Sequence, residues 1–561
     1  MLRITSLKCD YRSDGLYIET SKPSFSWILE SDGENITQKS YRIAVRNADK
    51  VIWDSGILQS DKSIHVQYEG DRLSPLTRYS YDVTVTVSNG ETACAEGSFE
   101  TGRLGMPFDA KFIYSGNVNK SDCTEPVHIF RKTFTLRDRK VIHAVMFASA
   151  IGIFEADIDG IPVSDEFFAP GNTNAFSHIQ YMEYDVTSLI KKNFTVQACV
   201  ANGWQLGRVD NKTNYYSDKR GFICEIHVFY DDGTKDVLIT DDTWEWSDES
   251  PVRFADFYDG ETYDANISPV NFKKCVLLPK DDCKKLIPRL GVPVKHHETL
   301  NVCNILKDPD GCNIYDFGQN FAGVVRIRTN APKGTVITVT HAELIHGGVF
   351  FTENLCTAKA TLKYICKGGG EEFMPRFTYM GFRYAKVHVS QPCDIELFGE
   401  VLYSDVEILS TFNSSNAKIN RLHRNIIWSG KGNFVDIPTD CPQRDERLGW
   451  TGDIAVFAST AAFNMDISLF MRKWLYDLES EQKDGVVPFT IPDVNIFDKP
   501  QKTPTAGWSD AACMVPWAVY MSTGDSDILA RQYESMKAWV NCEKSCCNDN
   551  LIWEDGFQFG D

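Results

Sequence analysis

The hydrophobic repeat of the chain changes from two residues to about 3.6 near residue 410. Upstream, stretches such as Tyr41–Val45 and Tyr79–Val87 alternate apolar and polar residues, as strands with one buried face do. Downstream, Ile419, Leu422 and Ile426 fall on one face of a helix. Because the two repeats need different packing partners, the sequence predicts strand-rich domains followed by a helical one.

The strand-rich part is too long for a single core. We expect a fibronectin type III-like β-sandwich over residues 1–103, a second sandwich over 104–288, a third over 289–405, and a helical domain over 406–561. In the first, Leu73, Pro75, Thr77 and Tyr79 resemble the signature in which a tyrosine hydroxyl ties a corner to nearby backbone. In the second, Asp159-Gly160 predicts a tight hairpin turn.

Three other stretches of the strand-rich part invite a functional reading. Asn202-Gly203-Trp204 could contact a carbohydrate, but a buried core tryptophan is the favoured interpretation. Tyr315–Asn320 and Pro375–Tyr384 carry no catalytic chemistry of their own, and we expect them to pack against the domain that follows.

The sequence pattern of the helical part predicts about five helices. One opens directly from an acidic loop and runs over 453–464. Two more are expected near 510–522 and near 526–545, and Pro516 should kink the first of these two. Another begins after Asp466 as its N-cap. Its apolar face consists of Ile467, Phe470, Met471, Trp474, Leu475 and Leu478.

The net charge and the cysteine content indicate which partners, location and metal sites the sequence favours. A net charge of -19 disfavours nucleic acid and anionic membranes, which attract basic faces, and it fits a neutral substrate better. The N-terminus lacks the apolar run of a signal peptide, and seventeen scattered cysteines are typical of reduced thiols, so we expect a cytoplasmic protein. Cys542, Cys546 and Cys547 have no following histidine, so we expect no metal and no cofactor.

The acidic loop runs from Asp440 to Asp453, just after Asp436. A mixed-charge loop is most often a solvated connector. Here a tryptophan follows Glu446 by four residues and a helical pattern starts at Gly452, which favours a pocket rim at a helix N-terminus. Crowded carboxylates can hold one carboxyl protonated, ready to give its proton to a leaving oxygen. The charged residues of the loop are Asp440, Arg444, Asp445, Glu446, Arg447 and Asp453.

This loop resembles the catalytic loop of the bacterial α-L-rhamnosidases, inverting glycoside hydrolases with β-sandwich domains before an (α/α)6 barrel. Further resemblance lies in Tyr184–Thr187 with Asn202–Trp204, in Tyr315–Asn320, in Pro375–Tyr384 and in Ala506–Asp510. The resemblance spans the whole chain and implies that residues 406–561 form the N-terminal part of the barrel.

The resemblance also implies roles for single residues. Glu446 corresponds to the general acid, and Asp445 with Arg447 to an ion pair within the loop. The expected rhamnose-binding residues are the polar Asp440, Arg444 and Asp453, the aromatic Trp450 and Trp508, and, more weakly, Asp510. We expect Asp440 and Asp453 to raise the proton affinity of Glu446.

The chain departs from the family where it ends, at Gly560-Asp561. The family barrel has about a dozen helices, and its general base is a glutamate from a later part. Glu543 and Glu554 come too early to match it, so we assign the base to no residue. We expect an incomplete barrel that hydrolyses rhamnosides very poorly and exposes apolar residues such as Phe470, Met471 and Trp474.

Two alternatives remain open at this point. A non-catalytic carbohydrate-binding or scaffolding protein would keep its glycan binding after deletion of residues 406–561, whereas a hydrolase would lose it. A glycosidase of another specificity on the same barrel is the second. The sequence leaves open the aglycone and the oligomeric state.

Overall fold

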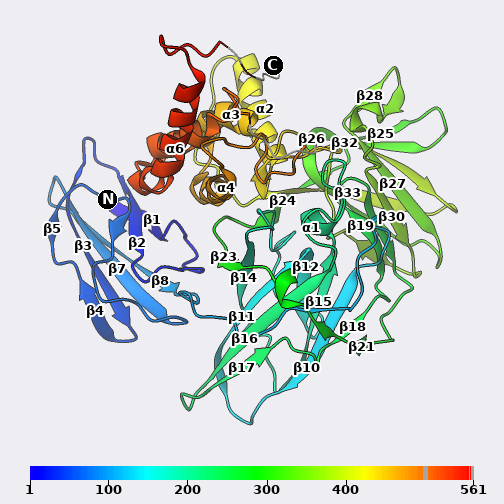
Figure 1. Ribbon diagram of the computed structural model, residues 1–561, viewed down its shortest axis with the longest axis horizontal. Helices are drawn as coiled ribbons and strands as arrows, with labels where there is room; N and C mark the ends of the chain where they lie inside the picture. The colour runs from blue at the N-terminus through cyan, green and yellow to red at the C-terminus, as the bar shows by residue number, and fades with distance from the viewer. Residues whose placement is uncertain (497–502, 555, 557–561) are drawn as a thin grey trace. The chain divides into compact units, whose positions relative to one another are not determined.

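The structure is a computed structural model that describes residues 1–496, 503–554 and 556, so Gly560 and Asp561 lie outside the described residues. It divides into two compact units. One holds Met1–Asp109 with Val519–Ala530, and the other holds Ala110–Ala518 with the described residues from Arg531 onward. In Figure 1 the blue-to-green part of the chain consists mostly of strands and the yellow-to-red part of helices, which confirms the predicted change near residue 410.

The first unit contains an immunoglobulin-like sandwich of two antiparallel sheets. One sheet has the order β1-β2-β6, and the other has the order β4-β3-β7-β8 with β5 on β3. The predicted tyrosine corner is confirmed, since the Tyr79 hydroxyl accepts a hydrogen bond from the Ser74 amide at 3.0 Å. The strands are β1 (Leu2–Cys9), β2 (Ser24–Ser31), β3 (Gln38–Asn47), β4 (Lys50–Asp54), β5 (Leu58–Gln59), β6 (Val66–Gln67), β7 (Arg78–Val87) and β8 (Thr92–Glu100).

The second strand-rich block is also built from two sheets, with the orders β13-β12-β15-β10-β18-β21 and β22-β9-β16-β11-β14-β23, and β17 beside β16. Asp159 and Gly160 both have positive φ in the β12–β13 turn, as the hairpin prediction requires. The strands are β9 (Ile113–Tyr114), β10 (His128–Thr135), β11 (Val141–Ile151), β12 (Ile153–Ile158), β13 (Ile161–Pro162), β14 (Ile179–Asp185), β15 (Asn193–Ala201), β16 (Gly221–Tyr230), β17 (Lys235–Ile239), β18 (Glu245–Ser247), β21 (Lys273–Lys274), β22 (Val276–Leu277) and β23 (Leu286–Pro288).

Trp204 of this block is a core residue, as the favoured interpretation has it. It lies on the short helix α1 (Gly203–Leu206), is buried, and packs against Phe257 and Phe168 with ring centroids 4.3 and 6.0 Å away.

The third block forms one ten-stranded sheet rather than two separate sheets. Two of its strands, β19 and β20, precede residue 288, and β20 pairs in parallel with β30. Sequence periodicity could not assign them, because it reports which face is buried and not which strand lies alongside. The strands are β19 (Val252–Asp256), β20 (Gly260–Asp264), β24 (Val294–Asn301), β25 (Asn304–Lys307), β26 (Asn313–Thr329), β27 (Val336–Ala342), β30 (Thr361–Ile365), β31 (Glu371–Phe373), β32 (Met380–Val389) and β33 (Ile395–Ser404), with a separate pair β28 (Leu344–His346) and β29 (Val349–Phe351).

Five helices follow within the described residues, with a two-stranded hairpin of β34 (Phe434–Val435) and β35 (Ile437–Pro438) after the first. They are α2 (Ala417–Asn433), α3 (Thr451–Asn464), α4 (Ser468–Glu481), α5 (Ala511–Thr523), which contains Pro516, and α6 (Ser526–Cys546). Among the described residues, every helix is too short or too polar to cross a bilayer.

The expected exposure of Phe470, Met471 and Trp474 is wrong. All three are buried, because α4 is covered by the second strand-rich block and by α6, whose Gln532 amide donates to the Leu475 carbonyl at 3.5 Å. The exposed apolar residues lie on the other helices instead. Examples are Ile419 (47% exposed) and Leu422 (59%), which were predicted to share one face of α2, and Phe463 (77%) of α3.

Lys473 joins α4 to the second block and to the chain before the acidic loop. Its side chain is 2% exposed, and its ammonium donates to the Asp436 carboxylate at 2.6 Å, to the Asp436 carbonyl at 3.1 Å, and to the Asn172 carbonyl. The Asn172 amide donates back to the same carboxylate at 2.5 Å. This buried ion pair therefore anchors the helices beside the strands.

Replacing Lys473 with methionine should lower the free energy of unfolding by about 3–5 kcal/mol, because Asp436 would stay buried without its counter-ion. Urea unfolding of the chain measures this loss. Lys418→Met at the exposed start of α2 is the control and should change little, whereas an equal loss in both variants would contradict the role of the pair.

Candidate active site

The acidic loop is an irregular segment between β35 and α3, as predicted, and hydrogen bonds join its two ends. The Asp440 amide donates to the Leu448 carbonyl at 3.0 Å, and the Leu448 amide donates to Asp440 Oδ1 at 2.8 Å. Arg447 has a positive φ of 50°, which turns the chain back. One carboxylate thus fixes the two ends of the segment that carries Arg444 and Glu446.

Two close backbone approaches hold the outside of the loop. A Cβ on Gly449 would lie 2.0 Å from the Ile491 carbonyl oxygen, and the Ile491 amide donates to the Gly449 carbonyl at 2.9 Å. A Cβ on Gly381 of β32 would lie 2.7 Å from backbone and ring atoms of Pro442. The Pro375–Tyr384 stretch therefore packs against the segment that follows, as expected.

Arg447 is the main internal anchor of the loop. Its buried guanidinium donates to four backbone carbonyls, those of Phe257 and Tyr379 at 2.7 Å and those of Gln443 and Arg444 at 3.1 Å. The expected ion pair with Asp445 is wrong, because carbonyls of three chain segments already satisfy this charge and Asp445 turns toward Thr357.

The opposite side of the loop brings Asp440, Arg444, Glu446 and Trp450 together. Arg444 Nη2 lies 2.6 Å from Glu446 Oε2 and 3.5 Å from Asp440 Oδ2. The Trp450 indole N–H donates to Glu446 Oε1 at 2.7 Å. The side chain of Asp440 is nearly buried, whereas those of Glu446 and Arg444 are 28% and 41% exposed, so a ligand can reach both.

The perturbed carboxyl of this cluster is Asp440. Burial raises its pKa to about 6, and the nearby Glu446 carboxylate acts in the same direction. Hydrogen bonds from Cys441 and the Leu448 amide, together with the Arg444 charge, oppose the rise in pKa. Asp440 therefore changes its protonation near pH 6.

Asp453 and Trp508, two further residues of the predicted sugar site, lie at the first turn of α3. Asp453 is exposed in the first turn of this helix. A Cβ on Gly452 would lie 2.8 to 3.0 Å from the indole ring of Trp508, so Trp508 packs directly on this turn. The helix start thus places Trp508 beside the loop that carries Trp450.

Asp510 is engaged elsewhere. Its Oδ1 accepts a hydrogen bond from the Trp539 indole at 2.9 Å, and its Oδ2 accepts one from the Gly507 amide at 2.8 Å. Both oxygens thus bind protein donors near the start of α5, and a contact with a ligand stays a prediction.

Asp440, Cys441 and Glu446 have ligand atoms within 4.8 Å of one another, a spacing that could hold a cation. The Arg444 guanidinium contacts both carboxylates and supplies positive charge at this point. The geometry therefore fits an arginine-paired acid cluster better than a metal centre.

A groove of about 520 Å³ adjoins the loop at Pro442. It lies between β26 and α2 and includes Gly318–Asn320, from the other stretch that we expected to pack against the helical part. Its lining also includes Trp428, Arg421 and Asn425 of α2.

Local sequence patterns do not identify the residues that support the loop from the strand-rich part. Tyr258, Thr357 and Arg208 contact the loop or its neighbours from positions about 90 to 240 residues earlier in the chain. The short Asp256–Gly260 stretch has no periodicity, so only the tertiary structure reveals it.

Four family models match consecutive parts of the chain. They are the N-terminal immunoglobulin domain (residues 4–105), the alpha-L-rhamnosidase N-terminal domain (139–284), the bacterial alpha-L-rhamnosidase concanavalin-like domain (306–403) and the bacterial alpha-L-rhamnosidase 6 hairpin glycosidase domain (407–561). The chain belongs to the bacterial α-L-rhamnosidase family. The last match covers the acidic loop and all five long helices, and the family is one of glycoside hydrolases.

Relatives of the same family align over most of this chain. An alpha-L-rhamnosidase of Formosa agariphila is 34% identical over 96% of the chain, which spans 61% of that relative. The crystal structure of the alpha-L-rhamnosidase from Aspergillus terreus has a TM-score of 0.90 at 34% identity, covering 96% of this chain and 65% of that one. The structure from Streptomyces avermitilis, complexed with L-rhamnose, has a TM-score of 0.89 at 26% identity, covering 98% and 71%.

The raised pKa of Asp440 predicts a pH-dependent stability. Because the folded pKa of about 6 exceeds the unfolded value, the contribution of Asp440 is present below pH 4 and is lost as the pH rises through 6. The free energy of unfolding of the wild type minus that of Asp440→Asn should fall by roughly 2 kcal/mol between pH 4 and pH 7. Urea titrations at each pH measure it, and a constant difference would show that Asp440 titrates normally.

Proposed function

We propose that the chain binds the terminal α-L-rhamnose of a glycoside and that Glu446 donates a proton to the departing oxygen, in a hydrolysis that inverts the anomeric carbon. The observation that carries this proposal is the accessible Glu446 carboxyl, held by the Trp450 indole on one oxygen and by Arg444 on the other. The family membership and the rhamnose complex of the Streptomyces relative support the choice of sugar.

The two contacts of Glu446 suggest which oxygen acts. The indole N–H of Trp450 fixes Oε1 within a compact loop, while the half-exposed Arg444 side chain on Oε2 can turn toward a ligand. A protonated Oε2 would then face the glycosidic oxygen. General acid catalysis of this kind contributes about 10²- to 10⁴-fold to the rate.

Asp440 is too close to Glu446 to serve as the base of an inverting pair. Their nearest oxygens lie within 4.8 Å, whereas inversion needs about 6.5 to 9.5 Å between the carboxyl groups so that water fits between them. We assign Asp440 and Arg444 to the sugar hydroxyls, and the general base to none of the described residues.

The indoles of Trp450 and Trp508 are proposed as the apolar walls of the sugar site. Rings of this kind stack on the C–H faces of sugars. Trp450 directly precedes α3 and Trp508 packs on the first turn of this helix, where Asp453 adds a polar group. All seventeen cysteines are free thiols, which supports a reducing location such as the cytoplasm as part of the proposal.

A carbohydrate-binding or scaffolding role is the second candidate, and the strand-rich blocks favour it. It places the sugar on those blocks, so glycan binding would be indifferent to the acidic loop. Trp450→Ala separates the two candidates, because only a sugar bound at the loop would lose affinity when the ring is removed.

Replacing Glu446 with glutamine should lower the turnover of an aryl α-L-rhamnoside by about 10²- to 10⁴-fold, because the amide cannot give up a proton at neutral pH. Binding of L-rhamnose, measured by isothermal titration calorimetry, should change little, since the side-chain shape is kept.

Glu372→Gln is the matched control, because Glu372 forms an exposed pair with Arg328 on the third sheet. This variant should keep both turnover and binding. Near-normal turnover in the Glu446 variant would remove Glu446 from the acid role.

A further inference from the structure

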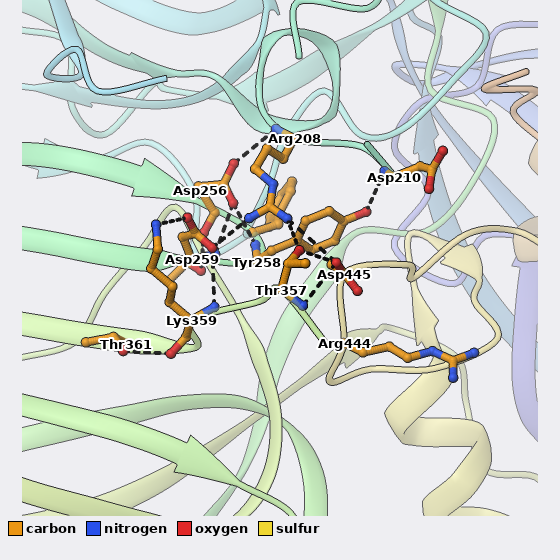
Figure 2. Close-up of polar contacts among 12 residues, drawn as sticks. Arg208, Asp210, Asp256, Tyr258, Asp259, Thr357, Lys359, Thr361, Arg444 and Asp445 are labelled. Carbon is orange, nitrogen blue, oxygen red and sulfur yellow. Dashed lines mark hydrogen bonds and ion pairs between the residues drawn. The ribbon is translucent and has the colours of Figure 1, made fainter. Parts of the chain in front are cut away.

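Three consecutive loop residues are anchored to the strand-rich part by three different groups. Asp445 is held through its carboxylate, Glu446 through its main-chain carbonyl, and Arg447 through its guanidinium. The side chains of Arg444 and Glu446 meet on the other side of the loop. Figure 2 shows Asp445 reaching into the strand-side network while Arg444 extends away from it.

Tyr258 makes the contact with Glu446 itself. Its hydroxyl donates to the Glu446 carbonyl at 2.6 Å and accepts a hydrogen bond from the Asp210 amide at 3.0 Å. The side chain is buried, and its ring lies near two guanidinium groups, those of Arg208 at 5.3 Å and Arg447 at 5.4 Å. The ring therefore has little freedom to move away from the loop.

The turn that carries Tyr258 is itself fixed. The buried Asp256 carboxylate accepts the amides of Tyr258 and Asp259 at 2.9 and 3.0 Å and that of Arg208 at 3.0 Å. Gly260 closes the turn with a φ of 108°, where a Cβ would lie 2.0 Å from the Thr361 carbonyl oxygen. The tyrosine hydroxyl is thus presented to the loop by a preorganised turn.

Asp445 is held through Thr357. The amide and the hydroxyl of Thr357 both donate to Asp445 Oδ2, and Arg208 Nη2 donates to the Thr357 hydroxyl at 2.6 Å. Arg208 in turn pairs with Asp259 at 2.8 Å, and Lys359 pairs with the other oxygen of Asp259 at 2.6 Å (Figure 2).

We propose that Tyr258, assisted by Thr357, is a positioning residue for Glu446, so that the strand-rich part sets the direction of the carboxyl that donates the proton. This inference rests on the proposed acid role of Glu446. A carboxyl on an irregular loop keeps its direction only if the backbone beneath it is fixed, and small displacements of a catalytic group can cost about 10²-fold in rate.

The test replaces Tyr258 with phenylalanine in the 561-residue chain labelled with 5-fluorotryptophan. We expect the ¹⁹F signal of Trp450, assigned with Trp450→Phe, to shift or broaden, because the partner of its indole becomes mobile. We also expect the kcat for an aryl α-L-rhamnoside to fall about 10- to 100-fold with KM changed less than about twofold.

Tyr364→Phe is the matched control. Tyr364 and Tyr258 are both 3% exposed, and the substitution removes only a hydroxyl from each. The Tyr364 hydroxyl, however, donates to Glu371 at 2.5 Å on the same sheet. The control should leave the Trp450 signal and kcat unchanged. Thr357→Val should reproduce the Trp450 shift from the Asp445 side.

An unchanged Trp450 signal in Tyr258→Phe, or an equal shift in both phenylalanine variants, would overturn the inference. If the wild-type chain shows no turnover, the proposed hydrolysis fails for this chain, while the ¹⁹F comparison still decides whether Tyr258 positions Glu446.

Discussion

The geometry of the acid cluster depends on one buried guanidinium. Arg447 binds carbonyls of the loop, of the Asp256–Gly260 turn and of the segment before β32, and so ties three parts of the chain together. Hydrogen bonds to a charged group contribute about 1.5–3 kcal/mol each, and they offset the cost of burying the charge. Without this anchor the glycines and prolines of the loop would leave it many conformations.

The second and third strand-rich blocks are therefore part of the candidate site. Arg447 and Tyr258 hold the back of the loop, the Gly381 backbone packs under Pro442, and the buried Lys473–Asp436 pair fixes the chain just upstream. The front of the loop carries Asp440, Arg444, Glu446 and Trp450, the groups that we propose to bind the sugar. One side of the short loop thus contacts the residues that support it, and the opposite side carries the groups of the proposed sugar site.

Local sequence patterns predicted the strands, the helices and the loop, because period, turn chemistry and helix breakers act over a few residues. The tyrosine corner at Tyr79 and the Asp159-Gly160 turn follow from such patterns. The partners of Arg447 and Tyr258 did not follow, since Tyr258 and Glu446 are 188 residues apart. An apolar stripe such as that of α2 does not reveal whether a neighbour covers it, and Ile419 and Leu422 are exposed.

A crystal structure of the chain with L-rhamnose tests the account most directly. We predict the sugar between Trp450 and Trp508, with its hydroxyls within about 3.2 Å of Asp440 and Arg444 and its anomeric oxygen within that reach of Glu446. The contacts of Arg447 and Tyr258 should be the same as without the sugar. A rhamnose bound on the strand-rich blocks, with Glu446 beyond hydrogen-bond reach, would contradict it.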